Sequence, residues 1–253
     1  MKAFPNRKIR LAALCLLLTA VGGLARAAEP GAVTAIYFTE VPPSLRSAFE
    51  DGMKRFLACI RSHGGTFTAL TYTELSDRGR YVTLEPFSSF AEMEAHEHDK
   101  GEIDCLDLFR AGVLPNFSQW SGQIALINPK LSYMGGGAQD PAPMLWMHAF
   151  RYKPGQRANF IEGEEKHAAA AAQTHSDIHF TAYDIYGAGQ SGPTLLYLAP
   201  SDSWVDIGRI LNLNASPGKA AARANHLKLA DSLAEEWSDV WIYDKELSYV
   251  QAK

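Results

Sequence analysis

Four side chains in the second half of the chain are of types that could do chemistry: His148, His179, Tyr183 and Tyr197. A neutral imidazole can act as a base or as a metal ligand near neutral pH, and a tyrosine hydroxyl can donate a hydrogen bond to a bound oxygen. We therefore predict His148 and His179 as catalytic residues, with the two tyrosines as hydrogen-bond donors. The alternative is that the four rings only fill a core and that their polar tips are satisfied internally.

Other motifs are weaker candidates for a site. Glu164 and His167 have the i, i+3 spacing of helical metal ligands, and the segment His96-Glu97-His98-Asp99 could bind a metal ion at the surface. For both we favour the polar edge of a solvated helix, because such short motifs are loose. Glu85 could be a buried base or a group at the rim of a cavity. We predict no metal ligand and no cofactor, and the sequence has no Gly-x-Ser-x-Gly, Walker or Cys-x-x-Cys motif.

Strand alternation would sort these side chains onto two faces of a sheet. We expect one face to pack beneath helices and the other, aromatic and polar, to line an enclosed space. The side chains of the first half alternate in the same register, and Tyr37 stands at the position of His148. Only the second half has imidazoles on the face that we expect to be enclosed, so a single site would lie on that half. A shift of one residue would invert both faces. The predicted ligand-binding residues are Trp146, Tyr183, Tyr197, Trp241, Tyr37 and Tyr72.

An internal repeat supports one register for both halves. Tyr72 matches Tyr183 at an offset of 111 residues, Leu84-Glu85-Pro86 matches Leu198-Ala199-Pro200 at 114, and Leu131-Ser132-Tyr133 matches Leu247-Ser248-Tyr249 at 116. The offset grows in steps, as it would if loops had gained residues between fixed elements. We expect a tandem duplication, with repeats at residues 31–134 and 144–253 and a Gly/Pro-rich linker at residues 135–143.

Each repeat has the order strand, helix, two strands, helix, strand. In the first we expect strands at 33–40, 66–75, 80–86 and 123–133, with helices at 45–63, 90–98 and 103–111. In the second we expect strands at 144–152, 178–186, 194–200 and 240–250, with helices at 155–174, 204–211 and 217–236. This order is the ferredoxin-like unit, whose sheet carries helices on one face only. A second copy of the same sheet is the expected cover for the other face.

At this level of element order, the whole chain after its N-terminal segment resembles the dimeric α+β barrel superfamily. That group includes antibiotic-biosynthesis-type monooxygenases, NIPSNAP and EthD-like proteins and, more distantly, the haem-binding chlorite dismutases. The resemblance implies an α+β fold in which two ferredoxin-like βαββαβ repeats pack sheet to sheet. The family usually builds this barrel from two subunits, whereas a duplication would build it from one chain.

The resemblance also implies a function for the space between the sheets. We expect a small apolar or aromatic ligand there, and a cofactor-independent oxygenase- or isomerase-like reaction is one role it suggests. Haem or metal binding through His148 or His179 is a second hypothesis, and a non-catalytic structural or stress-associated protein is a third. The sequence does not decide between an enzyme and a binding protein, nor between a monomeric pseudo-dimer and a homodimer.

The N-terminal segment has the layout of a secretory signal peptide. Basic residues precede an apolar run from Leu11 to Leu24, and Ala25-Arg26-Ala27 is a small-x-small cleavage motif. We expect residues 1–27 to be removed near Ala27, which would give a periplasmic or secreted protein with no membrane segment.

Removal of the signal peptide would make the chain more acidic. The whole chain has 24 Lys and Arg against 28 Asp and Glu, and the loss of five basic residues leaves 19 − 28 = −9. Such a charge argues against nucleic acid as a partner. Cys59 and Cys105 would remain, and the sequence leaves open whether they pair in an oxidising compartment or stay as buried thiols.

Overall fold

The computed structural model describes residues 32–76, 79–134, 141–173, 179–188, 192–213 and 230–251. The chain divides into Met1–Pro30, which lies outside this description, and a compact unit from Gly31 to Lys253. The predicted signal peptide, most of the linker and most of the predicted helix at 217–236 also fall outside the described residues. No helix in the described part of the chain is long and apolar enough to cross a membrane.

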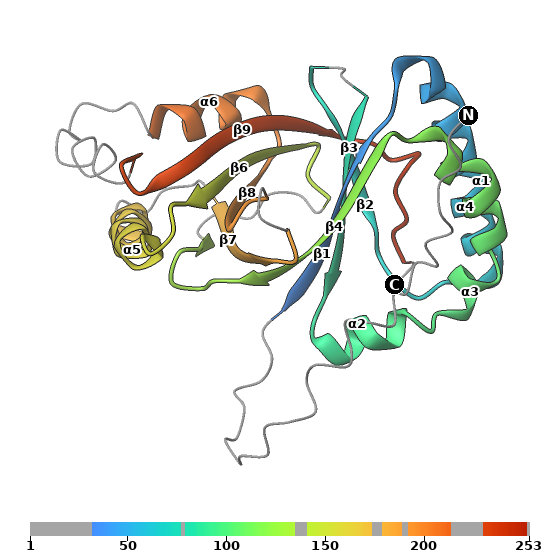
Figure 1. Ribbon diagram of the computed structural model, residues 1–253, viewed down its shortest axis with the longest axis horizontal. Helices are drawn as coiled ribbons and strands as arrows, with labels where there is room; N and C mark the ends of the chain where they lie inside the picture. Colours follow the sequence, from blue (N-terminus) through green and yellow to red (C-terminus); the bar gives the residue numbers. More distant parts are fainter. Residues whose placement is uncertain are drawn as a thin grey trace, which may run out of the picture. The chain divides into compact units, whose positions relative to one another are not determined.

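Eight antiparallel strands of the described residues close into a barrel (Figure 1). The first half supplies β1 (Val33–Glu40), β2 (Leu70–Glu74), β3 (Arg80–Phe87) and β4 (Gln119–Ile127), in the spatial order β4-β1-β3-β2. The second supplies β6 (Met144–Tyr152), β7 (His179–Tyr186), β8 (Leu195–Ser201) and β9 (Leu233–Tyr243), in the equivalent order β9-β6-β8-β7. Pairing of β2 with β9 and of β4 with β7 closes the barrel, so the predicted fold class is confirmed.

Helices cover the outer face of each half (Figure 1). The first half carries α1 (Arg46–His63), α2 (Phe90–His96), α3 (Lys100–Ile103) and α4 (Leu106–Gly112), and the second carries α5 (Arg157–Gln173) and α6 (Trp204–Leu213). A short 3-10 turn, Pro43–Leu45, precedes α1, and a second one, Leu114–Asn116, follows α4.

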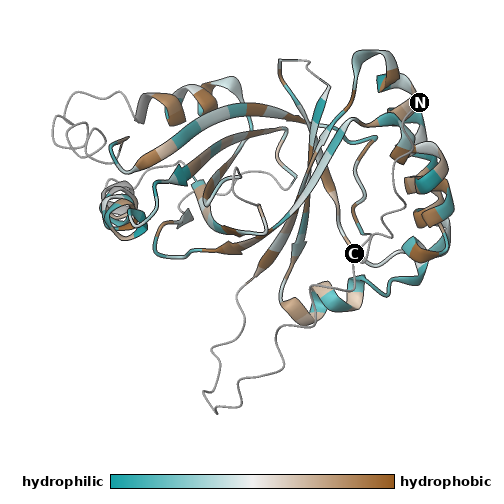
Figure 2. Ribbon diagram, viewed as in Figure 1, coloured by the Kyte–Doolittle hydropathy of each residue, from teal (hydrophilic) through white to brown (hydrophobic). Residues whose placement is uncertain are grey.

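The apolar stripe of α1 shows how the sequence places a helix on the sheet. Its buried side chains recur at three- and four-residue spacing and face the strands, while polar residues alternate with them along the helix (Figure 2). The helix ends at Gly64, whose φ of 70° is a left-handed conformation that suits glycine. The buried members are Phe49, Gly52, Phe56, Leu57 and Ile60.

Several element boundaries differ from the prediction: the strand expected at 123–133 is β4, and the helix expected at 103–111 is the two short helices α3 and α4. Two further differences have a clear local cause. The strand expected from residue 66 begins at Leu70, because the backbone N–H and hydroxyl of Thr66 bind the Asp99 carboxylate instead of a neighbouring strand. The helix expected to reach residue 236 is wrong at its end, because β9 starts at Leu233 and pairs with β6 along its length.

The two Leu-Ser-Tyr segments exchange places between the halves. Ser132 Oγ donates to the Asn128 carbonyl at 2.8 Å and accepts from the Ala182 N–H on β7 at 3.0 Å. In the same way, Ser248 Oγ donates to the Asp244 carbonyl at 2.7 Å and accepts from the Thr71 N–H on β2 at 2.8 Å.

The leucines of these segments follow the same exchange. Leu131 is buried in the core beneath α5 of the second half, against Phe150 and Phe160. Leu247 is buried in the core beneath α1 of the first half, against Phe49 and Tyr81. Each half therefore ends its chain by completing the core of the other.

Candidate functional site

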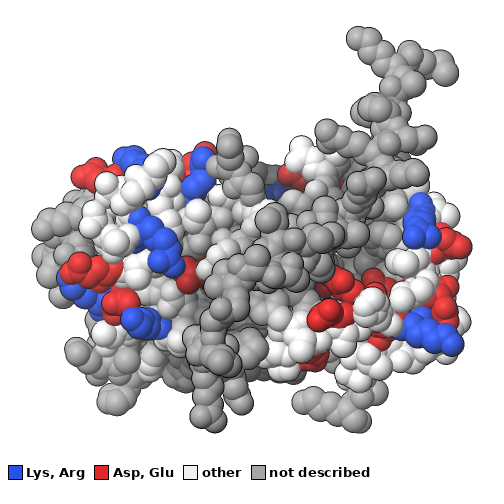
Figure 3. All heavy atoms as spheres, turned by 60° about the horizontal axis from the view of Figure 1, so that its bottom comes forward, with Lys and Arg blue, Asp and Glu red and all other residues white. Residues whose placement is uncertain are grey.

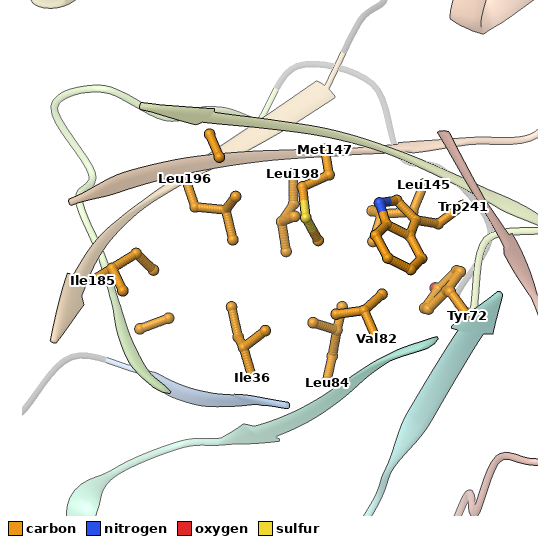
Figure 4. Packing of buried hydrophobic residues seen from close by; sticks show 12 residues of the cluster. Ile36, Tyr72, Val82, Leu84, Leu145, Met147, Ile185, Leu196, Leu198 and Trp241 are labelled. Atoms are coloured by element: carbon orange, nitrogen blue, oxygen red, sulfur yellow. The ribbon is translucent and has the colours of Figure 1, made fainter. Parts of the chain in front are cut away.

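The middle of the barrel is filled by hydrophobic side chains from both halves (Figure 4). Tyr72 and Trp241 lie together toward one side of the cluster in this view. Filling of this kind makes the centre of an eight-stranded barrel a core rather than a channel. Its aliphatic members are Ile36, Val82, Leu84, Leu145, Met147, Ile185, Leu196 and Leu198.

Three of the six predicted ligand-binding residues point into the barrel as expected: Tyr72, Tyr183 and Trp241. Burial raises the pKa of the Tyr183 hydroxyl, so this group stays protonated as a hydrogen-bonding group. Trp241 is fully buried, and its indole Nε1 has no hydrogen-bond partner among the described residues.

Four other predicted side chains point away from the barrel, so the inward orientation predicted for them is wrong: Trp146, His148, Tyr197 and Tyr37. Trp146 packs against Ile207 and Ile210 of α6. The Tyr197 hydroxyl donates to Glu164 Oε2 on α5 at 2.9 Å, so Glu164 lies on the buried side of its helix and not on a polar edge. Tyr37 stacks on Trp120 with ring centroids 5.7 Å apart.

The error follows the position of each strand in its sheet. The outer strands β2, β7 and β9 have the predicted orientation, whereas the central strands β1, β3, β6 and β8 are inverted. Aromatic rings with polar tips suit a partly wet cavity, which is the basis of the inward prediction. Helix carboxylates satisfy these tips equally well, as Glu50 of α1 does for the Tyr81 hydroxyl at 2.8 Å.

The predicted constellation is therefore divided between the two faces of the second sheet. His179 shares the inner face with Tyr183, since four residues separate them on β7. His148 lies outside, with Nε2 2.8 Å from Glu236 Oε1 and its ring between Trp146 and Phe150. The catalytic roles proposed for the two histidines stay predictions, but the two cannot act on one ligand from opposite faces.

A haem or metal ligand needs a free imidazole nitrogen, and Glu236 Oε1 occupies only Nε2 of His148, at 2.8 Å. Nδ1 is the nitrogen left to ligate, so His148 as a haem or metal ligand stays a prediction. His179 Nδ1 is buried and has no hydrogen-bond partner in the described residues. The five residues before it lie outside the described part of the chain, so His179 as a ligand remains a prediction.

The structure does have a pocket, beside the barrel and beneath α2. It has a volume of about 500 Å³, which lies within the range of small-molecule sites. Phe67, Leu70, Pro86 and Phe87 give it apolar walls, and His96 at the end of α2 contributes an imidazole. The predicted site is on the second half, whereas the first half supplies most of the walls of this pocket and Pro141, Val250 and Gln251 complete it.

His96 is packed tightly between rings and carboxylates. Its ring centroid lies 4.4 Å from that of Phe67 and 5.4 Å from that of Phe87. Its Nε2 is 3.6 Å from Glu85 Oε2 and 3.4 Å from Glu102 Oε2. Its Nδ1 is buried without a hydrogen-bond partner among the described residues. The side chain is only 13% exposed, so the solvated interpretation of this segment is wrong for His96.

Local capping explains why the chain presents these groups here. Ser89 caps α2 by accepting from the Glu92 N–H, while the Glu92 carboxylate accepts from Ser88 in return. Asp99 caps the short helix α3 and also accepts from Thr66 at 2.9 and 2.6 Å. These caps fix α2 and α3 against the ends of β2 and β3, which brings His96 and Glu102 together.

The charges of this cluster shift one another's proton affinity. Burial alone would lower the pKa of His96, but Glu85, Glu102 and Asp99 outweigh it and the pKa is raised. Burial raises the pKa of Glu102 to about 7, with Glu85 and Asp99 adding to the rise and His96 opposing it. Burial, followed by the charge of Glu85, raises the pKa of Tyr37. A histidine held as the cation beside a cavity can donate a hydrogen bond to a ligand.

Sequence reasoning finds most members of this cluster separately and does not join them. Tyr37 is a predicted ligand-binding residue, Glu85 a candidate base, and His96 and Asp99 belong to a candidate surface metal site, but nothing in the sequence links them. Glu102 carried no signal, because it lies in a charged segment typical of solvent. The pattern that could have found the site is a histidine among acids at the end of a short capped helix.

Comparison with protein-family models and with curated proteins found no match to this sequence. Solved structures do match its fold. A candidate monooxygenase from Lactobacillus acidophilus NCFM is 10% identical, with a TM-score of 0.55 over 87% of this chain and 97% of its own. An anthrone oxidase-like protein is 11% identical, with a TM-score of 0.58 over 89% of this chain and 95% of its own.

A third match is chlorite dismutase from Candidatus Nitrospira defluvii in complex with imidazole, at 9% identity and a TM-score of 0.54 over 87% of this chain and 93% of its own. At such low identity these likenesses concern the fold alone. Together with the closed antiparallel barrel and its strand order, they show that this chain has a dimeric α+β barrel fold, with both sheets supplied by a single polypeptide.

Proposed function

We propose that the protein binds a small, mainly apolar molecule with an acceptor oxygen in the pocket beneath α2. One observation carries the proposal: a cavity of ligand size is lined by an imidazole that two carboxylates favour as the cation. The centre of the barrel is filled with apolar side chains, so the proposal moves the ligand from the lumen to this pocket.

His96 Nδ1 has no hydrogen-bond partner among the described residues, and the ligand would offer it an acceptor oxygen. Since this nitrogen is buried, the imidazole would turn toward the cavity as the ligand enters. A buried donor without a partner costs about 1–3 kcal/mol, and an acceptor oxygen on the ligand would recover that cost. Phe67 and Phe87 flank the imidazole and would pack against an aromatic or alicyclic body.

The charge around the pocket favours a neutral ligand over an anion. Glu92 lines the cavity, and Glu94 and Glu97 follow it along the surface of α2 and its end. Figure 3, in which the bottom of Figure 1 comes forward, shows acidic side chains gathered on this side of the molecule. An anionic ligand would meet their repulsion, whereas a phenol or ketone would not.

An oxygenase-like reaction is the activity that fits this binding mode. A cationic donor at the ligand oxygen stabilises negative charge that develops there when the ligand loses a proton. A carboxylate of the cluster such as Glu85 takes the proton, and the carbanion formed passes its electrons to dioxygen as the co-reactant. One oxygen atom of dioxygen stays in the product and the other leaves as water. The fold neighbours described as a candidate monooxygenase and as anthrone oxidase-like support this role.

A matched pair of probes tests the proposal. Anthrone and anthracene share a tricyclic body, but only anthrone has an oxygen. We expect anthrone to bind about tenfold more tightly, since a hydrogen bond to a charged donor is worth about 1.5–3 kcal/mol. His96→Gln should remove this preference, and His98→Gln, at the exposed neighbouring histidine, should keep it. Calorimetry measures both affinities, and an oxygen electrode measures turnover.

Two outcomes would count against the proposal. If neither probe binds, the pocket does not accept aromatic ligands of this size. If His96→Gln and His98→Gln bind anthrone alike, the imidazole is not the recognition group, and a structural role for the cluster is the better account.

We further propose that the protein is exported and that its halves arose by duplication. The signal-like N-terminus supports export, and the equivalent bonds of Ser132 and Ser248 support duplication. Since one chain supplies both sheets, we take the monomer as the functional unit. Mass spectrometry of protein from the periplasm should give a chain starting near Ala28, and light scattering should give one chain per particle.

A further inference from the structure

A disulfide ties the α3–α4 segment, which holds Glu102 beside His96, to α1. Cys59 on α1 is bonded to Cys105, which lies two residues after the end of α3 and is the N-cap of α4, with 5.9 Å between their Cα atoms. Cys105 is 1% exposed, whereas Cys59 is partly open to solvent. A thiol from solution can therefore reach Cys59 Sγ more easily than Cys105 Sγ.

His63 stands beside both sulfur atoms. Its Nδ1 lies 3.6 Å from Cys59 Sγ and 3.7 Å from Cys105 Sγ, and the ring itself is exposed. Nδ1 is also 2.9 Å from the Cys59 carbonyl, an acceptor that requires a proton on this nitrogen. A protonated Nδ1 cannot ligate a metal, so the three side chains are better arranged for proton transfer to sulfur than for holding an ion.

We propose that Cys59–Cys105 is an exchangeable, redox-active disulfide with His63 as its proton donor, and that its reduction loosens the α3 wall of the His96 cluster. The first part stands on the geometry around the sulfurs. The second concerns the same residues as the proposed ligand pocket, and its significance for binding rests on that proposed function.

The reductant is a dithiol. Its first thiolate attacks Cys59 Sγ, the S–S bond breaks, and the electron pair leaves on Cys105 Sγ, which takes a proton from Nδ1 of His63 in its imidazolium form. The ring then regains a proton, the one that the first thiol released. The second thiol then attacks the mixed disulfide and releases Cys59 as the thiolate, which is protonated in turn. Overall the dithiol becomes a disulfide, and its two protons end on Cys59 and Cys105.

The link from the disulfide to the pocket runs through α3. This helix has four residues, too few to be stable without anchors, and it carries Glu102 within 3.4 Å of His96. Besides Cys105, its anchors are the Asp99 bonds to Thr66 and the close approach of Gly101 to Gly65. Loss of the covalent anchor leaves these weaker contacts to hold Glu102 against His96.

The rate of reduction tests the role of His63. Native protein is treated with dithiothreitol, and free thiols are trapped by alkylation and counted by mass spectrometry. His63→Asn keeps an N–H near the position of Nδ1 but cannot give up a proton. It should slow reduction about tenfold, a modest general-acid effect, while His98→Asn should react like the wild type. Equal rates for the two variants, or reduction only after denaturation, would overturn the proposal.

The response of His96 tests the link to the pocket. The groups that face His96 are Glu85, Glu102 and Asp99, and only Glu102 and Asp99 belong to the α3 segment. In NMR titrations the His96 midpoint should fall on reduction, and the Cys59→Ala/Cys105→Ala double variant should show the same fall without reductant. An unchanged midpoint in both would overturn the link.

The two proposals fail independently, because neither redox readout requires a ligand. If anthrone does not bind but reduction shifts His96, only the proposed function is lost. If anthrone binds equally to oxidised and reduced protein and His96 does not shift, the pocket stands and the redox control is lost.

Discussion

The space beneath α2 and the space beneath α6 are equivalent places in the two halves, yet they are built differently. Glu85 on β3 corresponds to Ala199 on β8 at the repeat offset of 114. Beneath α6, Ala199 packs among Trp146, Ile207 and Ile210 in a purely hydrophobic cluster. Beneath α2, the matching position carries a carboxylate against a buried imidazole.

This comparison shows which side chains beneath the helix are needed for folding and which are not. The second half shows that hydrocarbon is enough to hold a helix on this sheet. The titratable groups of the first half are therefore not a condition of folding, and burying them costs free energy that hydrophobic side chains would not. Such groups are expected where binding or catalysis needs them.

The largest effect should come from moving the charge to the other half. Ala199→Glu places a carboxylate in a fully buried apolar site and should lower the free energy of unfolding by about 4 kcal/mol at pH 7. Urea denaturation measures it. Ala199→Gln, equal in size but uncharged, should cost less, and the gap should narrow at pH 4, where a buried carboxyl is protonated. Equal losses at pH 7 would mean that volume, not charge, sets the cost.

Inside the barrel the halves should instead behave alike. Leu84 on β3 and Leu198 on β8 occupy equivalent positions in the two halves, and both belong to the buried core of the barrel. Leu84→Ala and Leu198→Ala should each lower the free energy of unfolding by about 3 kcal/mol, as large-to-small core changes do. Urea denaturation of the two single variants gives the comparison. A difference above about 1.5 kcal/mol would show that the halves are unequal inside the barrel too.

The charged cluster should make stability depend on pH. The folded pKa of Glu102, about 7, lies above its unfolded value of about 4.3, so its contribution is complete below that value and is lost as pH rises through 7. The raised pKa of His96 acts in the same direction, above pH 6.5. Glu102→Gln should remove about 1–2 kcal/mol of the stability difference between pH 5 and pH 8, after screening of a partly exposed group.

The matched control for this measurement is Glu94→Gln, because Glu94 is exposed on α2. Its stability should follow the wild-type pH profile between pH 5 and pH 8. If Glu102→Gln shows that same profile, the carboxyl does not titrate within the cluster as described.

The smallest effect concerns the exchanged Leu-Ser-Tyr segments. Ser132→Ala and Ser248→Ala each remove an acceptor from a strand N–H, and each should cost about 1 kcal/mol. Thermal unfolding of the single variants measures the loss, with the exposed Ser118→Ala as control. Clearly unequal losses of stability in the two variants would mean that the two Leu-Ser-Tyr segments do not contribute equally to the halves they contact.

The sequence contained most of the fold, because the fold depends on local patterns. The stripe of α1 and the Leu-Ser-Tyr repeats are signals within one segment each, and the inward orientation of Tyr72 and Tyr183 followed from alternation along their strands. The inverted central strands show the limit of that argument. Alternation gives two faces, but which one is inside depends on partners such as Glu164, which arrive from another element.

The candidate site could not be predicted as a unit. Tyr37, Glu85, His96 and Glu102 come from four elements, and none has a fixed spacing to another. Their proximity depends on how α2 and α3 cross the ends of the strands, which is a property of packing and short caps rather than of periodicity. The disulfide could not be predicted from the sequence either, because pairing of Cys59 with Cys105 requires α3 to lie against α1.

The exchange of chain ends has a consequence for synthesis. The first half leaves the ribosome long before residues 247–249, which fill its core beside Phe49 and bond to β2. Until the last residues emerge, β2 has an unpaired edge that invites association with other chains. A nascent chain of this kind benefits from being held unfolded until it is complete, and truncation by only a few C-terminal residues should damage the N-terminal half first.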